Sequence, residues 1–361
     1  EGRIEILIIN QTNPVFTLPE AAGFKAALAE IPLIVSLSSF MDETTAMADL
    51  ILPSHTYLES WGDDSPEPGV GFSVGAISQP VVSPLYNTRA TGDILLELAQ
   101  KLELGDAYSA ASMEDYLKER WSEIYARGAN IEGDTFESFW TTVLQAGVWG
   151  EKTRKASNTF VPDKRVIEKI AVAAPEFAGD SDAYPFLLHP YVSNSLRDGR
   201  GANLPWLQEL PDPLTGVVYG SWVELHPSTA NKLGLAEGDL VEVESPQGKI
   251  AAPVLIYHAI RPDVIAMPIG QGHAEYGRYA RNRGANPMQI LAPIMDSETG
   301  SLASSATRVK LRATGRRAQL IKSGGESREL GRGIVQTTGS SANHGEHSAN
   351  LHSIPITVEP S

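Results

Sequence analysis

The 361-residue sequence contains no cysteine. Disulfides, thiolate nucleophiles and cysteine-ligated iron–sulfur clusters are therefore excluded from this chain. Long apolar runs are missing too: the most apolar stretches, Ile6–Ile9 and Leu33–Leu37, are far shorter than the ~20 residues that a membrane helix needs. We therefore expect no direct membrane span within these residues.

Positive charge is scarce, with 29 Lys and Arg against 44 Asp and Glu and a net charge of −15. A surface of that sign repels duplex nucleic acid, so we expect no nucleic-acid partner. One basic run stands out near the carboxyl end, and we interpret it as a segment that docks on an acidic partner: Arg308, Lys310, Arg312, Arg316, Arg317, Lys322, Arg328 and Arg332.

Strands and helices alternate over residues 1–105, which predicts part of an α/β domain with a parallel sheet. Arg3 and Glu5 interrupt any apolar leader, and the first strand starts at Ile6, so we expect upstream residues that are missing or lie on another polypeptide. The expected strands are Ile6–Ile9, Leu33–Leu37 and Leu50–Leu52, and the expected helices are Glu20–Ile31, Asp42–Ala48 and Gly92–Leu102.

Three further segments follow. Residues 106–182 are predicted to be a helical insert and linker, with amphipathic helices at Met113–Ala126 and Thr135–Ala146. Residues 183–312 favour β-structure, because Leu240–Glu244 and Lys249–Tyr257 flank a Pro-Gln-Gly turn. Residues 313–361 are rich in Gly, Ser and charge and are expected to form an extended arm. The predicted fold class is α/β followed by mainly β.

A family resemblance rests first on the segment His226–Gly248. Its helix Pro227–Leu233 ends at Gly234, and a Gly238-Asp239 turn leads into a strand pair. This pattern resembles the C-terminal domain of molybdopterin oxidoreductases of the dimethyl sulfoxide reductase type. The Asn13-Pro14 turn and the signature Phe40–Pro53 extend the resemblance to the amino-terminal part. It implies a partial α/β domain over 1–105 and a double-psi β-barrel over 183–312.

The stretch Gly270–Pro287 narrows the branch, since it resembles the large iron–sulfur subunit of alternative complex III and of the related quinone reductase complex. The resemblance implies a structural portion of a membrane-associated, quinol-oxidising complex in respiratory or photosynthetic electron transfer. Its expected partners are iron–sulfur, heme c and quinone-binding subunits. It further implies a peripheral position on the periplasmic side of the membrane, with iron–sulfur clusters in an adjoining polypeptide.

Working members of the family hold guanine-dinucleotide pterins between two domains. The positions that match on this sequence follow the first strands, where loop N–H groups can hold phosphates, and recur in the barrel. The matching residues are Asn10, Asn13, Pro14, Ser38, His189, Gly270, Gln271, His273 and Asn286, with Arg278, Arg281 and Arg283 available to offset phosphate charge. No catalytic residue and no metal ligand are predicted.

Two departures from the family pattern bear on the cofactor. Ser38 stands where the family often has an acidic residue, and the family's Glu-Gly-Arg motif is absent from the loop that begins at Gly71. We therefore predict that this chain holds no cofactor and keeps the cradle for docking. The alternative is a true molybdenum or tungsten enzyme that binds molybdopterin guanine dinucleotide; a third hypothesis is an independent binding module that reuses the barrel.

Overall fold

The computed structural model describes residues 2–65, 72–105, 108–128, 134–150, 175–296 and 299–323. The chain divides into two units, residues 1–323 and 324–361, and the second lies outside the described residues. So do the linker 151–174 and all but the start of the arm predicted at 313–361. The boundaries of the four predicted segments stay predictions.

A three-stranded parallel sheet forms the amino-terminal part, in the order β1-β2-β3. Ile8 pairs with Val35, and Val35 with Leu50. Ile9, Leu28 and Ile34 form the small core between this sheet and its helices. The elements are β1 (Ile6–Ile9), α1 (Pro14–Thr17), η1 (Glu20–Ala22), α2 (Phe24–Leu28), β2 (Leu33–Ser36), η2 (Thr45–Met47) and β3 (Leu50–Ile51).

The helix predicted over Glu20–Ile31 is broken in two. Gly23 has φ +71°, a left-handed conformation that ends η1 and precedes α2. Only glycine takes that conformation readily. The helix is therefore interrupted at Gly23, although the apolar residues keep helical spacing on both sides. The helix predicted at Asp42–Ala48 is a single 3₁₀ turn, and Asp42 does accept a hydrogen bond from the Thr45 N–H at 2.7 Å.

A separate aromatic core joins the insert to the preceding loop. Its helices are α4 (Met113–Ala126) and α5 (Phe136–Ala146), and its antiparallel strands are β4 (Gly62–Asp64), β5 (Val74–Ser78) and β6 (Val148–Gly150). Helix α3 (Thr91–Lys101) precedes them outside this core. Ser112 and Thr135 cap α4 and α5. Trp121, Phe139 and Trp140 pack against Ile77 of β5. The sequence pattern predicted α4 and α5 but not this sheet.

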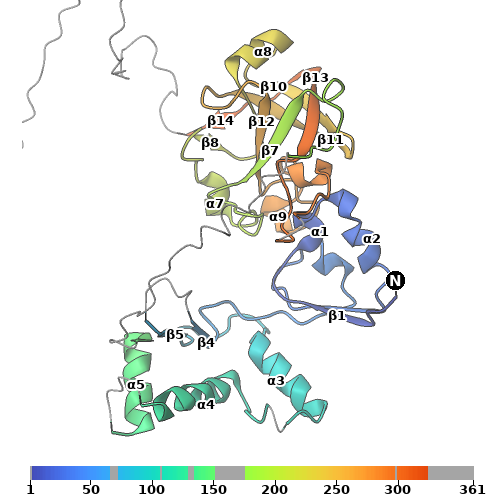
Figure 1. The fold of residues 1–361 in the computed structure, drawn as a ribbon. Helices are drawn as coiled ribbons and strands as arrows, with labels where there is room; N and C mark the ends of the chain where they lie inside the picture. The colour runs from blue at the N-terminus through green and yellow to red at the C-terminus, as the bar shows by residue number, and fades with distance from the viewer. Residues whose placement is uncertain are drawn as a thin grey trace, which may run out of the picture. The chain divides into compact units, whose positions relative to one another are not determined.

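The carboxyl-terminal part is a closed barrel in the strand order β10-β11-β9-β12-β7-β13. β7 and β12 pair in parallel, β7 and β13 antiparallel, and the three lie side by side in Figure 1. The core is aliphatic and includes Leu188, Val241 and Ile265, each fully buried. The strands are β7 (Phe186–Val192), β9 (Val223–Leu225), β10 (Asp239–Ser245), β11 (Gly248–Ile256), β12 (Val264–Ile269) and β13 (Thr307–Arg317).

Several short helices and one strand pair flank the barrel. Helix α8 (Pro227–Leu233) ends at Gly234 with φ +65°, as the sequence predicted. The others are α7 (Pro205–Glu209), α9 (Gly277–Ala280), η4 (Pro287–Ile290), and the strand pair β8 (Val217–Val218) and β14 (Ile321–Lys322). The predicted fold class, α/β followed by mainly β, is confirmed; the double-psi topology of the barrel stays a prediction.

Five residues of the basic run lie in the barrel strand β13: Arg308, Lys310, Arg312, Arg316 and Arg317. β13 continues to Arg317, past residue 312 where the barrel was expected to end. Lys310 and Arg312 both pair with Glu244, and Arg317 pairs with Asp239 on the neighbouring strand. Much of the positive charge in β13 is therefore neutralised within the barrel, which leaves less of it for a partner than the sequence suggested.

Candidate functional site

The carboxyl group of Glu43 joins the two parts of the molecule. It accepts hydrogen bonds from Asn13 Nδ2 at 2.7 Å and from the backbone N–H groups of Ala274 at 2.8 Å and Glu275 at 3.2 Å. His273 Nδ1 lies 3.1 Å from both carboxyl oxygens. The Asn13 turn thus meets the loop that follows β12 through one side chain.

His273 has a contact on its ring face and one on each of its two ring nitrogens. Its ring stacks on Phe16 with centroids 3.7 Å apart, and only 2% of its side chain is exposed. Nε2 lies 3.2 Å from the carbonyl oxygen of Gly199, while Nδ1 faces Glu43. Both neighbours are acceptors, so both contacts are hydrogen bonds only when both nitrogens carry hydrogen, which is the imidazolium form. The pair is then a buried ion pair.

Glu43 is a strong acid in this setting. Burial opposes its ionisation, but the hydrogen bonds from His273 and Asn13 and the charge of His273 outweigh burial and lower its pKa to about 2 from 4.5. Asp42 next to it behaves differently: burial raises its pKa, although Thr45 donates to it. The junction therefore keeps Glu43 ionised at every physiological pH.

A hollow of about 170 Å³ opens beside this ion pair. Glu43 lines it together with Gly272 and Asn286 from the barrel and Lys25 from α2. Asn286 Nδ2 donates to the carbonyl oxygen of Phe16 at 2.8 Å, which is a second bond between the two parts. Pro14, at the first position of α1, also lines the hollow.

The structure brings four predicted site residues together here: Asn13, Pro14, His273 and Asn286. Gly270 and Gln271 lie on the same loop but face another way. Gly270 packs its backbone on the loop 196–199, and Gln271 Nε2 donates to Gln208 Oε1 at 2.7 Å in a buried amide pair.

Asn10, Ser38 and His189 lie elsewhere. The Asn10 side chain meets Thr91 at 3.5 Å, and the Ser38 hydroxyl donates to the carbonyl oxygen of Phe40 within its own turn. His189 is exposed on the outer face of β7, 2.9 Å from the Ser305 hydroxyl. Their grouping with the other residues is not seen, because a strand end fixes where a loop starts but not where its side chains point.

Two residues at the centre of the site were missed. Glu43 stood inside the recognised signature Phe40–Pro53, but no role was assigned to it, and Phe16 had no signal beyond its place after Pro14. A carboxylate with no basic neighbour in sequence does not reveal a partner 230 residues away.

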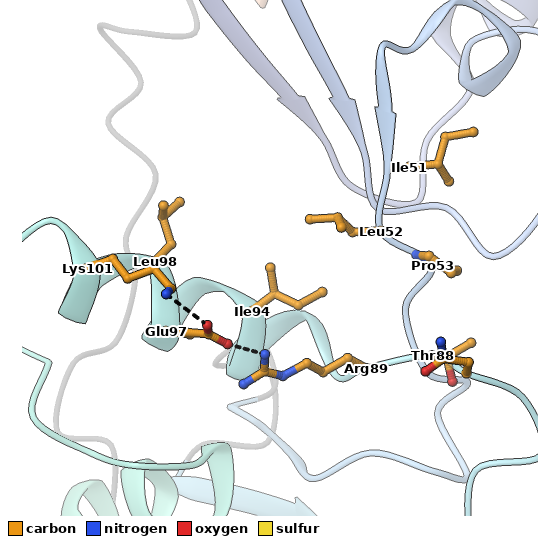
Figure 2. Close-up of a pocket in the computed structure, with 10 residues that line it drawn as sticks. Ile51, Leu52, Pro53, Thr88, Arg89, Ile94, Glu97, Leu98 and Lys101 are labelled. Atoms are coloured by element: carbon orange, nitrogen blue, oxygen red, sulfur yellow. Dashed lines mark hydrogen bonds and ion pairs between the residues drawn. The ribbon is translucent and has the colours of Figure 1, made fainter.

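A larger hollow of about 600 Å³ lies apart from these residues, between α3 and the end of β3. Figure 2 shows Ile94 and Leu98 of α3 on one side and Leu52 on the other. Its charged groups are already paired, since Glu97 bonds both Arg89 and Lys101. This hollow contains none of the predicted site residues.

Residues 1–101 match the molybdopterin oxidoreductase family, and residues 206–303 match the molybdopterin dinucleotide binding domain. The chain belongs to the molybdopterin oxidoreductase family. The two matches contribute Glu43 and His273, one residue each, to the buried ion pair.

Curated relatives of this family member have several functions. The chain is 32% identical over 299 residues to the menaquinone reductase molybdopterin-binding-like subunit of Nitratidesulfovibrio vulgaris, covering 81% of this chain and 40% of that protein. It is 27% identical to the molybdopterin-containing subunit of arsenate respiratory reductase from Shewanella, covering 83% of this chain and 43% of that subunit. The chain thus spans less than half the length of these relatives.

The fold has a counterpart among solved structures. Acetylene hydratase from Pelobacter acetylenicus superposes with a TM-score of 0.67 at 18% identity, covering 86% of this chain and 44% of the enzyme. At that identity the likeness concerns the fold alone. In the described part of the chain, no helix has the length and apolar character to cross a membrane.

The prediction that this chain holds no cofactor is wrong. The match of residues 206–303 to a dinucleotide-binding domain, beside that of 1–101, points to a molybdopterin cofactor, which was the alternative. That prediction rested on the departures at Ser38 and in the loop after Gly71. Ser38 bonds only within its own turn, so its identity says little about the hollow beside Asn286.

The residues around the hollow fit one wall of such a site. Its volume of about 170 Å³ falls below the roughly 300–1,000 Å³ of ligand pockets, so this chain alone does not enclose a dinucleotide. Lys25 lines the hollow, and the exposed guanidinium of Arg283 has no bonded partner within the described ranges. Both cations suit phosphate oxygens. No group of three or more potential metal ligands occurs in the residues described.

Proposed function

We propose that this chain forms one wall of a pterin dinucleotide site in a subunit of a quinol-oxidising, alternative complex III-like electron-transfer complex. The observation that carries the proposal is the Glu43–His273 pair. It fastens the Asn13 turn of one matched domain to the Gly270–Gly277 loop of the other, beside a hollow that residues from both domains line.

The chain's own groups would bind and orient the cofactor. Gly272 and Asn286 would present the barrel side of the site, Pro14 the α/β side, and Lys25 would meet phosphate oxygens. Arg283, whose carbonyl oxygen accepts from the Gly272 N–H at 2.7 Å, would add a second cation beside the hollow. When bound, a pterin dinucleotide supplies a ligand set for molybdenum or tungsten and a path for electrons. His273 does not act as a proton donor to a substrate in this proposal, since both of its nitrogens are engaged.

The assignment to a membrane complex is supported by the similarity to a menaquinone reductase subunit, which covers most of this chain. We propose iron–sulfur, heme c and quinone-binding subunits as partners, and a peripheral place on the periplasmic side of the membrane. Heme-containing subunits should then copurify with this chain from its natural source. The purified complex should also oxidise menaquinol.

The cofactor is tested on the same purified complex. Oxidation in acid should release a fluorescent pterin in at least stoichiometric amount, and Glu43→Gln should lower that amount severalfold. Glu20→Gln is the matched control, because Glu20 lines the same hollow but bonds nothing there within the described residues. A wild-type complex without pterin would overturn the proposal.

A second candidate is the catalytic portion of an oxyanion reductase. It is favoured by the arsenate respiratory reductase subunit, which aligns with 83% of this chain. Reduction of arsenate with a reduced viologen dye, without oxidation of menaquinol, would establish this candidate in place of the first.

A further inference from the structure

A second cavity of about 230 Å³ lies on the outer face of the barrel, away from the ion pair of Glu43. Strands β7, β9 and β12 form its floor, and the segments 212–215 and 257–260 form its rim. Its polar lining consists of His189, Tyr191, Asp212, Thr215, Glu224 and Tyr257, and its apolar lining consists of Leu214, Ala259, Ile260, Val264 and Ala266.

Glu224 is the unusual group in this cavity, because only 6% of it is exposed. One carboxyl oxygen, Oε1, accepts from Tyr191 Oη at 2.6 Å and from Trp222 Nε1 at 3.0 Å. No bond to the other oxygen, Oε2, occurs among the described residues. Yet Oε2 is not among the fully enclosed unbonded atoms, which in the described part are two tryptophan nitrogens. It is therefore accessible within the cavity that Glu224 lines.

Within the described residues, no cation forms an ion pair with this carboxyl group. His189 lines the same cavity, but its contact is the Ser305 hydroxyl at 2.9 Å. Its two donors are neutral, and burial together with the charge of Glu224 raises the pKa of Tyr191, so the phenol remains a donor. A buried carboxylate with no opposite charge is costly, and a bound cation would remove much of that cost.

Asp212 adds negative potential at the rim. Its Oδ1 is engaged by the Leu214 N–H and by the Thr215 N–H and hydroxyl, at 2.9 to 3.1 Å. These bonds fix the rim without neutralising it.

The cavity suits an organic cation better than a metal ion. The described residues contain no cluster of three or more metal-ligating side chains. An apolar wall around a single accessible carboxyl oxygen matches an alkyl stem that ends in a charged group. The volume of about 230 Å³ is below the roughly 300–1,000 Å³ of pockets for larger ligands, so the ligand is small or is a side chain.

We propose that this cavity binds an alkyl ammonium or guanidinium group, with the cation on the carboxyl group of Glu224 and its stem against Val264 and Ala266. The cation belongs either to a diffusible amine or to a lysine or arginine side chain of another subunit. The site is distinct from the proposed pterin wall and does not depend on that wall.

The probe is agmatine, a small guanidinium with an alkyl stem, titrated calorimetrically into the full polypeptide that contains this chain, alone and within its complex. We expect saturable binding to the polypeptide alone, weakened at least tenfold by Glu224→Gln. The glutamine keeps an acceptor for Tyr191 and Trp222, so the fold should persist, as circular dichroism will check. Glu242→Gln, on the paired surface carboxyl of β10, is the control and should bind as the wild type does.

The outcomes separate the two sources. Binding to the polypeptide alone but not to the complex identifies a side chain of another subunit as the natural occupant. Binding to both identifies a diffusible amine. Absence of saturable binding in both forms, or equal affinity of the wild type and folded Glu224→Gln, overturns the proposal.

Discussion

The junction around Glu43 and the outer barrel wall around Glu224 each bury a carboxyl group, and they compensate it differently. Glu43 has a cationic partner and three further donors, whereas Glu224 has two neutral donors and a free oxygen at a cavity. Their side chains are similarly buried, so exposure does not separate them. The two carboxyl groups differ in how completely their oxygens are hydrogen-bonded. The carboxyl group of Glu43 stabilises the junction, whereas that of Glu224 keeps one oxygen available to a ligand.

The largest expected effect tests the first half of this contrast. Glu43→Gln keeps the shape of the side chain but replaces a carboxylate, which accepts from Asn13, Ala274 and Glu275, with an amide that has one acceptor and two N–H donors. Breaking a buried pair by removing one charge costs about 3–5 kcal/mol. We expect a loss of that order in the free energy of unfolding, measured by urea denaturation. A loss below about 1 kcal/mol, within the range of exposed ion pairs, would show that the junction is not a buried pair.

Acid should reveal the same pair without mutation. The pKa of Glu43 is 4.5 in the unfolded chain and about 2 when folded, so its contribution to stability is full above pH 4.5 and is lost as the pH falls toward 2. The urea midpoint of the wild type should therefore fall across that window. Glu43→Gln should show a flatter fall, and parallel curves for the two proteins would contradict the assignment.

A smaller effect is expected where the loop approaches Asn286. Gly272 has φ +94°, and an added Cβ would lie 2.4 Å from the Asn286 nitrogen, so Gly272→Ala meets both strain and a clash. Gly220 has φ +75° with nothing within 4 Å of such a Cβ. We expect Gly272→Ala to cost about 2–3 kcal/mol and Gly220→Ala about 1 kcal/mol. Equal melting temperatures for the two variants would show that the loop can move away from Asn286.

The contrast also shows what the sequence could and could not predict. Helical periodicity placed α4 at Met113–Ala126, and a continuous apolar run placed β1 at Ile6–Ile9, both with the bounds that the structure has. The strand β5 was missed because Val74–Ser78 contains a glycine and lies in a long loop, and its partner β6 comes about seventy residues later.

The site was recovered only in part, for a similar reason. Asn13, His273 and Asn286 were predicted from motifs, and they do meet. Glu43, which bonds two of them, was not predicted, because nothing local to Glu43 indicates a partner on the barrel loop. Glu224 lay beside a recognised motif, yet its burial depends on how β7, β9 and β12 pair, which composition and spacing do not reveal.

The smallest expected effect tests the second half of the contrast. Glu224→Gln removes a buried charge that has no opposite charge beside it, while Tyr191 and Trp222 keep their acceptor. Replacing such a charge with a neutral group of the same shape should change the free energy of unfolding by less than about 1 kcal/mol, or raise it. Urea denaturation of Glu43→Gln and Glu224→Gln side by side gives the comparison directly. If Glu224→Gln lost as much stability as Glu43→Gln, Glu224 would be a second structural anchor, and its free oxygen would not indicate a ligand.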